Sequence, residues 1–542
     1  MSYRSPNPDV DIPNVSVYEY LFGSIMAADL DRTALVDSDS RESFTYRQLL
    51  DQIDRVAGGL AARGLTPGDV VAIYSHNTPR FAAVLHGVLR AGGAASPINA
   101  LYTVKDVAEQ LRKANAKFLF TTSQQYSQAV EAAGLAGVPR GQIITIDDTL
   151  GCFSLQNLID LGARAPKLQF DPAKQVAVLT FSSGTTSTPK GVQLTHRNLV
   201  ANIAQTMSPL AITKEDVVLG LLPFFHIYGL TVLLNLAFKC RTRVVTVPRF
   251  ELERFLRIVE DHRLTYLFIA PPVAVHLATD PRVDAHDVSS IRVIMSGAAP
   301  LDAALGRRVQ QRLGARVVQG YGMSELSPVS HAIPVGRDDI DLNSVGLPVA
   351  NTENRLVDLD SGREIERPLA GLSVPGELWI KGPNVMKGYL DNSEATSNTI
   401  DEDGYLHTGD IAVFGHDGSV FIVDRLKELI KYKGYQVAPS ELEAVLLDHP
   451  DIVDAAVIGV KDATGEEVPK AFVVRRPQTE LDGVTVIDFV SQRVSPHKKV
   501  RSVAFVDIIP KSASGKVLRR ELRAMDIGSP ARASRDYRRG NL

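Results

Sequence analysis

The sequence predicts an α/β protein: a large N-terminal domain of doubly wound sheets with a β-barrel-like part, and a small α+β C-terminal domain joined by a hinge. Strand and helix patterns alternate over residues 43–121 and again over 217–318, as in parallel sheets covered by helices. Between 345 and 423 the pattern changes to short strands with turn signals, such as Asp403 with Gly404. A dense charged run over 424–431 coincides with the break between two differently patterned regions, which favours a hinge there.

The elements of the two alternating regions can be placed from their apolar spacing. Thr45 and Gln48 form a capping box, so a helix is expected to start there and to end at Gly64. Other strands and helices of the first region are expected over 69–74, 81–92, 103–115 and 118–120. The second region predicts strands over 217–222, 244–247, 266–270, 291–295 and 317–318, with helices over 252–261 and 301–313.

The C-terminal region restarts after Arg425 as a smaller unit. Ser440 and Glu443 are spaced as another capping box, and strands over 455–460 and 470–474 precede a helix over 485–493. A chain of 542 residues is too long for one core. We therefore expect an N-terminal domain over 1–426, a mobile C-terminal domain over 427–527 and a basic, flexible tail over 528–542.

Composition narrows the class of protein. The formal net charge is -3, which gives no bulk electrostatic case for nucleic acid or membranes. Cys152 and Cys240 are the only cysteines and are not spaced as metal ligands, which fits a reducing compartment. The sequence has no apolar run of 18 residues and its first residues are unlike a signal peptide. We expect a cytoplasmic protein, monomeric or homodimeric.

A Ser/Thr-rich loop over 182–191 is the centre of the chemical interpretation. It follows an apolar strand and is followed by Thr195, a plausible N-cap, so we expect strand, loop and helix in succession. Glycines, six hydroxyls and Lys190 suit a phosphate cradle, but the spacing is not that of a Walker A loop. The alternative is a polar surface linker.

Four other motifs support a nucleotide enzyme, each with a structural alternative. The stretch over 319–325 follows a strand and could hold a base on Tyr321 and Mg²⁺ on Glu325, or could be a tight turn with a core tyrosine. Asp410, placed after a strand, could hold ribose hydroxyls or sit in a hairpin turn. The charged run could be a hinge or a solvated face. Lys516, on a small-residue loop, could clamp a phosphate or face solvent.

In this order and at these spacings, the motifs resemble those of the adenylate-forming enzymes: acyl-CoA synthetases, luciferases and adenylation domains. The similarity runs from about residue 43 to 523. The stretches over 222–229, 376–382 and 423–439 are most similar to the 4-coumarate–CoA ligase-like branch. The resemblance implies an AMP-forming acid–CoA ligase that uses ATP, Mg²⁺ and CoA. It would form an acyl-adenylate, release pyrophosphate, and transfer the acyl group to CoA with release of AMP.

The resemblance also implies roles for particular residues. Those expected to hold ATP or AMP are Ser182, Ser183, Gly184, Thr185, Thr186, Lys190, Gly297, Ala298, Ala299, Gln319, Gly320, Tyr321, Ser324, Asp410 and Arg425, with Glu325 on Mg²⁺. Those expected to be catalytic are Lys516, His226, Lys431 and Gln436. The acyl group would meet Tyr228, Met295, Gly320, Pro328, Val329 and Lys427, the last also being the hinge. CoA would face Arg249, Lys433 and Gly434.

Departures from the branch leave the acid open. Met295 stands where coumarate ligases usually have a lysine, Thr231 where they have an asparagine, and Ser187 replaces a usual glycine. A thioether cannot donate a hydrogen bond to a phenol, so the acid could be a 4-coumarate- or cinnamate-like aryl-propenoate or a medium- or long-chain fatty acid. Carrier-protein loading, luciferase-like oxygenation and nucleotide binding without catalysis are the remaining alternatives.

Overall fold

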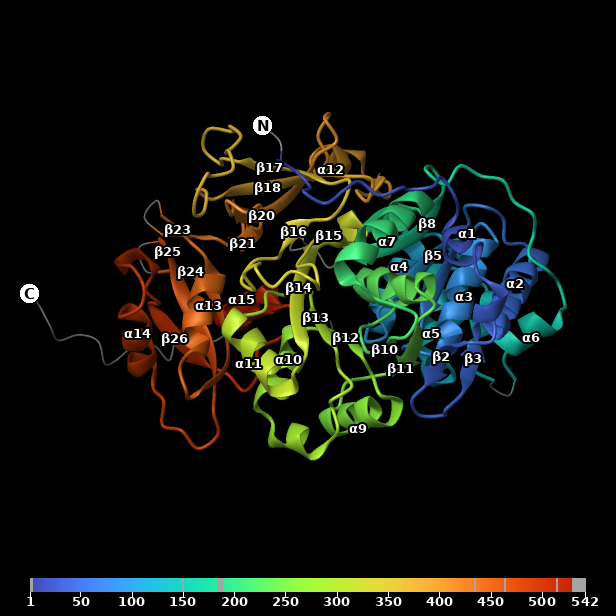
Figure 1. Cartoon of the computed structure of the whole chain (residues 1–542), viewed down its shortest axis with the longest axis horizontal. Helices are drawn as coiled ribbons and strands as arrows, with labels where there is room; N and C mark the ends of the chain where they lie inside the picture. Colours follow the sequence, from blue (N-terminus) through green and yellow to red (C-terminus); the bar gives the residue numbers. More distant parts are fainter. Residues whose placement is uncertain are drawn as a thin grey trace, which may run out of the picture. The chain divides into compact units, whose positions relative to one another are not determined.

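The computed structural model describes residues 3–148, 151–182, 189–432, 435–462, 465–512 and 515–528, with the backbone alone for Ser182, Tyr435, Gln436 and Ile527. These residues fall into two compact units. The first consists of Met1–Thr408 with Val413–Phe421, and the second of Gly409–Ala412 with Ile422–Leu542. Figure 1 shows the order of their helices and strands along the chain.

The first alternating region forms a seven-stranded sheet in the order β19-β9-β8-β5-β4-β6-β7. Its strands are β4 (Val70–Tyr74), β5 (Ala94–Ile98), β6 (Ala116–Thr121), β7 (Ile143–Thr145), β8 (Val176–Ser182), β9 (Lys190–Thr195) and β19 (Gly388–Tyr389). Its helices are α2 (Tyr46–Ala62), α3 (Pro79–Arg90), α4 (Val104–Lys113), α5 (Tyr126–Ala136) and α6 (Leu155–Asp160). Strands β8, β5, β4, β6 and β7 are parallel, as predicted. The capping box of Thr45 and Gln48 is present at α2.

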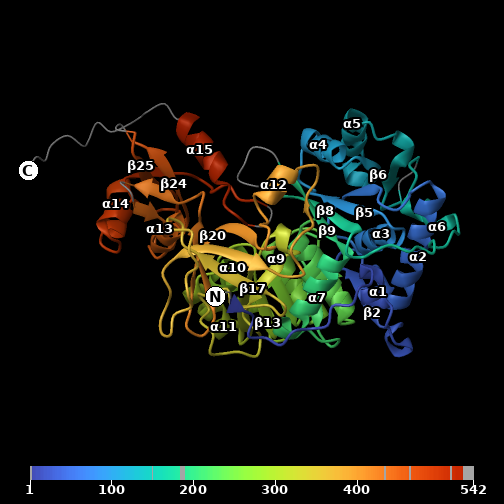
Figure 2. The same cartoon turned by 90° about the horizontal axis from the view of Figure 1, so that it is seen from above.

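Successive residues of β4 point to opposite faces of this sheet and meet different helices. Ala72 and Tyr74 pack with α4 and α5, whereas Val71 and Ile73 pack with α2 and α3. Figure 2 shows these two pairs of helices on opposite sides of the strands. Alternation with period two along a strand that is buried on both faces produces the doubly wound arrangement.

A nine-stranded sheet follows, in the order β16-β15-β14-β13-β12-β10-β11-β2-β3. Its strands are β2 (Thr33–Asp37), β3 (Ser43–Thr45), β10 (Val217–Gly220), β11 (Arg243–Thr246), β12 (Tyr266–Ile269), β13 (Val293–Ser296), β14 (Arg316–Gly322), β15 (Val329–Ala332) and β16 (Leu347–Pro348). Helices α9 (Leu252–His262), α10 (Pro271–Thr279) and α11 (Ala303–Leu313) cover one face, where Leu219, Val245 and Ile294 point.

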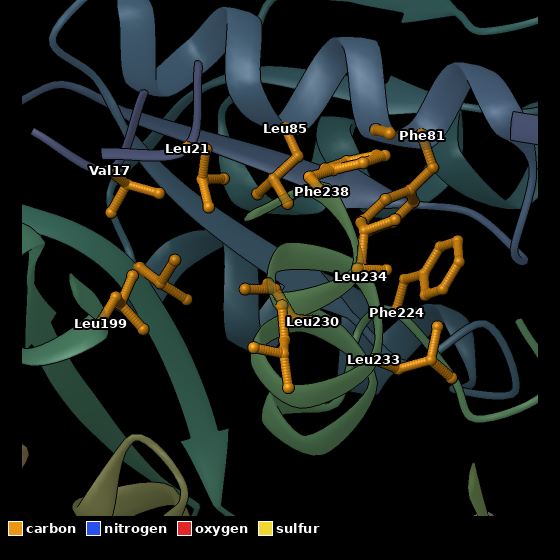
Figure 3. Close-up of a cluster of buried hydrophobic side chains, with 14 of the residues drawn as sticks. Val17, Leu21, Phe81, Leu85, Leu199, Phe224, Leu230, Leu233, Leu234 and Phe238 are labelled. Atoms are coloured by element: carbon orange, nitrogen blue, oxygen red, sulfur yellow. The ribbon is translucent and has the colours of Figure 1, made fainter. Parts of the chain in front are cut away.

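The opposite face of the nine-stranded sheet belongs to the largest hydrophobic cluster of the first unit. This cluster also contains residues of α1 (Val17–Phe22), α3, α7 (His196–Leu210), the π-helical segment η4 (Tyr228–Asn235) and α8 (Leu236–Lys239). Figure 3 shows Phe81 and Leu85 facing Phe238 and Phe224 in this cluster. Each such side chain gains about 1.5–3 kcal/mol on burial. The segment from Phe224 into η4 is therefore fixed on a packed core.

The β-rich region predicted over 345–423 forms a five-stranded sheet in the order β1-β17-β18-β20-β21. Its strands are β1 (Tyr3–Arg4), β17 (Glu353–Val357), β18 (Gly376–Lys381), β20 (Leu406–Phe414) and β21 (Val420–Arg425). The short helix α12 (Ser393–Ser397) follows β19. Gly404 and Gly418 have φ of 86° and 89°, the left-handed conformation expected of the predicted turns.

The second unit contains a hairpin of β22 (Ile430–Tyr432) and β23 (Tyr435–Val437), and a three-stranded sheet of β24 (Ile452–Lys461), β25 (Glu467–Arg475) and β26 (Ser502–Phe505). Helices α13 (Pro439–Leu447), α14 (Gly483–Ser491) and α15 (Arg519–Gly528) accompany these strands. The predicted tail beyond 528 lies outside the described residues. None of the helices in the described part of the chain has the length and apolar composition needed to span a bilayer.

The predicted capping box of Ser440 and Glu443 is wrong. Helix α13 starts two residues earlier than that box requires, at Pro439, and its N-cap Ala438 makes no side-chain hydrogen bond. The Ser440 hydroxyl instead donates to the Val423 carbonyl, and Glu443 Oε1 accepts from the Val457 N–H at 2.8 Å. Both side chains therefore hydrogen-bond to other segments of the second unit instead of capping the helix. Pro439 occupies the first helical position, where its fixed φ already suits a helix.

Candidate active site

The Ser/Thr-rich loop joins two antiparallel strands, so the predicted succession of strand, loop and helix is wrong. Ser182 at the end of β8 pairs with Lys190 at the start of β9, and α7 begins only after β9, with Thr195 as its N-cap. The missed strand has buried Val192 and Leu194 on alternate positions, but a Gly and a Gln interrupt its apolar pattern. The helix N-terminus is therefore one strand away from the loop.

Part of the expected phosphate loop lies outside the described residues. This applies to Ser183, Gly184, Thr185, Thr186 and Ser187, and to the side chain of Ser182. Lys190 is described: its Nζ lies 4.7 Å from the centroid of the Tyr389 ring. An ammonium over an aromatic face keeps its positive charge, which is then available to an anionic ligand.

Glu325 lies beside the same tyrosine. The Tyr389 hydroxyl donates to Glu325 Oε1 at 2.9 Å, and the Glu325 side chain is buried, with 7% of its surface exposed. The structure therefore brings together Lys190 and Glu325, the residues predicted for phosphate and for Mg²⁺, through a tyrosine that the sequence analysis did not single out.

The surroundings of Glu325 fit Mg²⁺ held jointly with a nucleotide. Among the described residues no group of three or more His, Cys, Asp or Glu side chains could form a metal cage. Mg²⁺ is usually bound by one or two carboxylates together with substrate phosphates and water, so a single buried carboxylate near a phosphate loop suits it. When bound with ATP, Mg²⁺ offsets phosphate charge.

The stretch predicted to follow a strand is largely the end of the strand itself, because β14 extends through Gly322. Gln319 is used structurally: its Oε1 accepts from the Leu301 N–H at 3.2 Å and its amide donates to the Leu342 carbonyl. Tyr321 lies 5.8 Å, centroid to centroid, from the ring of His331. Ser324 begins the 3₁₀ turn η6 (Ser324–Leu326) and is half-buried.

Two glycines in this region are required by close approach. A Cβ on Gly320 would lie 2.7 Å from the His331 carbonyl oxygen and from Met295 Cε. A Cβ on Gly297 would lie 2.7 Å from the Tyr228 ring. After Gly297 the chain turns outward: Ala298 is exposed at φ 70°, a left-handed conformation uncommon for alanine, and Ala299 is half-buried. The predicted adenine wall is thus a short, strained turn at the end of β13.

Five of the six residues predicted to meet the acyl group lie in the first unit, whereas Lys427 lies in the second. Met295 and Val329 are 1% and 5% exposed. The Tyr228 hydroxyl donates to the Met295 carbonyl at 3.4 Å, and burial raises the pKa of this hydroxyl. Pro328 is buried beside Gly322, whose Cβ would lie 2.0 Å from the Pro328 carbonyl oxygen. This wall is apolar except for backbone carbonyls and one phenol.

His226 lies at the entry to η4. Its Nδ1 accepts from the Tyr228 N–H at 3.2 Å, so the proton of the neutral ring is on Nε2. Thr231, the departure from the usual asparagine, is 1% exposed within the π-helical segment. π-helical segments often mark functional sites, because the widened turn re-aims side chains.

Buried asparagines that the sequence analysis missed hold the loops of this site. Asn77 donates to the Gly220 and Leu222 carbonyls at 2.9 Å and accepts from the Phe224 N–H at 2.8 Å, just before His226. Asn202 brackets Val329, accepting from its N–H at 3.1 Å and donating to its carbonyl at 2.6 Å. These residues look unremarkable in sequence, because their partners are distant backbone groups.

Arg249, expected to face CoA, is exposed on the loop between β11 and α9. Its expected partners Lys433 and Gly434 lie outside the described residues, as does the side chain of Gln436. Lys431, on β22, is exposed and donates its backbone N–H to Glu467 Oε2 at 2.9 Å. Lys427 is exposed in the turn between β21 and β22.

In the second unit, Asp410 and Arg425 are brought together. Arg425 Nε lies 3.3 Å from Asp410 Oδ1. Asp410 was placed after a strand, with a hairpin turn as the alternative to a ribose role, but it lies inside β20 and is 4% exposed. The alternative of a hairpin turn is wrong, because Gly409 adopts φ 68° within the strand rather than at its end.

Lys516 lies in the same unit, close to that pair. It is half-buried; its backbone N–H donates to Ser512 Oγ at 3.1 Å, and its carbonyl accepts from the Ser512 N–H at 2.8 Å. Burial, reinforced by the nearby positive charge of Arg425 and opposed by Asp410, lowers the pKa of Lys516 to about 8. The Lys516 ammonium is thus easier to deprotonate than an ordinary lysine.

Comparison with known proteins matches the sequence to a family. Residues 25–390 match the model of AMP-binding enzymes, and residues 441–516 match the AMP-binding enzyme C-terminal domain. Two curated relatives are 4-coumarate–CoA ligase 3 of Oryza sativa subsp. japonica, 40% identical over 96% of this chain and 94% of the relative, and 4-coumarate-CoA ligase 1 of Narcissus pseudonarcissus, 38% identical over 96% of each.

Solved structures agree with the sequence relatives. ATP-bound MatB from Rhodopseudomonas palustris superposes with a TM-score of 0.85 at 29% identity, covering 95% of this chain and 99% of that one. A benzoate CoA ligase from Burkholderia xenovorans LB400 gives a TM-score of 0.83 at 26% identity, covering 94% of this chain and 100% of that one. The chain belongs to the family of AMP-binding enzymes.

Proposed function

We propose that this AMP-forming acid–CoA ligase activates an apolar aryl-propenoate of the cinnamate type in two steps. The acid carboxylate attacks the α-phosphorus of ATP, a P–O bond to the acid forms, the bond to the β-phosphate oxygen breaks, and pyrophosphate leaves. The CoA thiol then attacks the acyl carbonyl, loses its proton, and AMP leaves. The names of the relatives support the aryl-propenoate class, and the wall around Met295 supports an apolar ring.

The first step joins anions, so the enzyme must offset their repulsion. In this proposal Lys190 and the loop over 182–186 hold the β- and γ-phosphates, and Glu325 holds the Mg²⁺ that accompanies ATP. The adenine and α-phosphate are surrounded by Gly297, Ala298, Ala299, Gln319, Gly320, Tyr321 and Ser324. The buried carboxylate of Asp410, with Arg425 beside it, is suited to two ribose hydroxyls.

The second step needs a different set of groups around the acyl carbonyl. We place Lys516 on the carboxylate and α-phosphate during adenylation, with His226 beside the acyl carboxylate. Lys431 and Gln436, on paired positions of the β22–β23 hairpin, serve the thioester step, and Arg249, Lys433 and Gly434 face CoA. A C-terminal domain over 427–527 that turns about Lys427 would exchange these two sets. We further propose a cytoplasmic monomer or homodimer, consistent with two unpaired cysteines.

The choice of acid rests on Met295. The phenolic hydroxyl of bound 4-coumarate would be buried against the Met295 thioether and against the Tyr228 hydroxyl, which already donates to the Met295 carbonyl. Neither side chain offers it a further hydrogen-bond donor, and burying a hydroxyl without a partner costs about 1–3 kcal/mol. Cinnamate should therefore equal or exceed 4-coumarate in kcat/KM. Octanoate tests the fatty-acid alternative, which the same apolar wall would also accept.

The experiment measures kcat/KM for cinnamate, 4-coumarate and octanoate by pyrophosphate release and by CoA thioester formation. Met295→Lys should shift preference toward 4-coumarate by roughly tenfold, since it supplies the missing donor. A wild-type preference for 4-coumarate over cinnamate would refute the apolar-ring assignment. A large preference for octanoate over both would favour the fatty-acid ligase.

A further inference from the structure

Tyr389 joins two parts of the candidate site, Lys190 on β9 and Glu325 on the turn η6. It lies on β19, which pairs with β9 so that Tyr389 is opposite Val192, close to Lys190 on the same strand. The centroid of its ring lies 4.7 Å from Lys190 Nζ, and its hydroxyl donates to Glu325 Oε1 at 2.9 Å. One side chain thus contacts both groups assigned to phosphate and Mg²⁺.

The backbone around Tyr389 ties the same two segments together. The Met386 N–H donates to the Glu325 carbonyl at 2.8 Å, and the Leu390 N–H donates to the Gly191 carbonyl at 2.7 Å. The Tyr389 N–H itself donates to Thr396 Oγ1 at 2.9 Å. The backbone around Tyr389 is therefore held on both sides by the segments that carry Glu325 and Lys190.

The chemistry of the three side chains explains why a tyrosine suits this place. A direct ion pair between Lys190 and Glu325 would satisfy both charges within the protein, and the structure shows no ion pair between these two described residues. The phenol instead donates a proton to one carboxylate oxygen, which leaves the carboxylate charged and oriented, and its ring face attracts the ammonium without neutralising it.

We propose that Tyr389 is a positioning residue for the reaction: it orients the Glu325 carboxylate toward Mg²⁺ and holds the Lys190 ammonium beside the phosphates. This inference rests on the proposed function, because it takes the Mg²⁺ and phosphate roles of Glu325 and Lys190 from it. It predicts that Tyr389 acts through Glu325 on the metal and, by its ring alone, through Lys190 on the phosphates.

The test measures ATP binding to the whole protein by calorimetry, with Mg²⁺ and with EDTA, in the absence of acid and CoA. Tyr389→Phe removes the donor and keeps the ring, so it should weaken Mg²⁺-ATP binding by roughly tenfold and change metal-free ATP binding by less than about twofold. Tyr389→Leu removes the ring as well and should weaken both. In steady state, the Mg²⁺ concentration for half-maximal rate should rise in Tyr389→Phe while KM for the acid stays unchanged.

Tyr405→Phe is the matched control. The Tyr405 hydroxyl donates to Glu353 Oε1 at 2.5 Å, so it is another tyrosine–glutamate hydrogen bond of the same unit, away from the candidate site. It should leave Mg²⁺-ATP binding unchanged. Glu325→Gln alone and with Tyr389→Phe completes a double-mutant cycle, in which the tyrosine substitution should have no further effect once the carboxylate is gone.

The outcomes separate the two proposals. If the wild-type protein binds Mg²⁺-ATP and Tyr389→Phe binds it as tightly as the wild type or as Tyr405→Phe, the role of Tyr389 is overturned and the proposed function is not. An effect of Tyr389→Phe that persists in full in the Glu325→Gln background also overturns it, because the tyrosine would not act through the carboxylate. Wild-type protein that binds no Mg²⁺-ATP and releases no pyrophosphate overturns the proposed function together with this inference.

Discussion

Asn77 offers a sharp test of how the loop that carries His226 is positioned. Asn77→Ala removes three hydrogen bonds from the segment between Gly220 and Phe224. The Gly220 carbonyl keeps a long bond from the Val247 N–H at 3.4 Å. The Leu222 carbonyl and the Phe224 N–H lose their Asn77 partner in a buried setting. At about 1–3 kcal/mol for each unsatisfied group, the variant should lose about 2–6 kcal/mol of stability.

The functional consequence should be specific to the acid. His226 follows the released loop by two residues, so KM for the acid should rise by roughly tenfold or more, while KM for ATP changes by less than about threefold. Thermal unfolding and initial rates of pyrophosphate release, with each substrate varied in turn, measure the two effects.

Gln205→Ala is the control, because Gln205 is also a buried amide of the first unit and donates to the Ala350 carbonyl at 2.7 Å. It should lower stability without a selective effect on the acid. An Asn77→Ala variant with unchanged stability and unchanged KM for the acid would refute the reasoning, as would an equal rise in both KM values.

Three other predictions concern the C-terminal domain. Lys516→Ala should lose adenylation by roughly 10²–10³-fold, yet convert supplied acyl-adenylate and CoA at nearly the wild-type rate; equal loss of both half-reactions would favour a static site. Lys427→Pro should form the acyl-adenylate but fail to transfer it to CoA, because proline fixes φ at the hinge; normal thioester formation would count against the hinge. The pKa of Lys516 is lowered to about 8, so its charge is present below that pH and lost above it. Adenylation should therefore decline as pH rises through about 8, and Lys516→Arg should shift that decline to higher pH if it remains active; the pH–rate profile of the first half-reaction checks this.

Local patterns predicted the parallel parts of the fold well. The alternation of strands and helices, the capping box at Thr45 and the turn at Gly404 all depend on neighbours in sequence, and the structure confirms them. The polar strands were harder to predict from the sequence. Strand β9 and the part of β20 around Asp410 contain glycine and polar residues, and they are strands because each is paired on both sides, β9 with β8 and β19, and β20 with β18 and β21.

In the candidate site, too, some residues could be predicted from the local sequence and others could not. Loops rich in Gly, Ser and Lys could be recognised from composition, and the structure brings Lys190 close to Glu325 and Asp410 close to Arg425. The supporting side chains, Asn77 and Tyr389, carry no local signal. Their partners are backbone or carboxylate groups far along the chain, so their importance depends on tertiary structure.

Strand β1 has a consequence for the order in which this protein folds during synthesis. Tyr3 and Arg4 pair with Asn354 and Glu353, and the Ser5 hydroxyl donates to the Pro348 carbonyl. At typical translation rates of about 5–20 residues per second, the partners of β1 emerge roughly 20–70 s after it. The edge of the five-stranded sheet is therefore closed late, by a segment synthesised well before its partners, and a fusion that restrains Tyr3 and Arg4 would delay that closure rather than alter the catalytic groups.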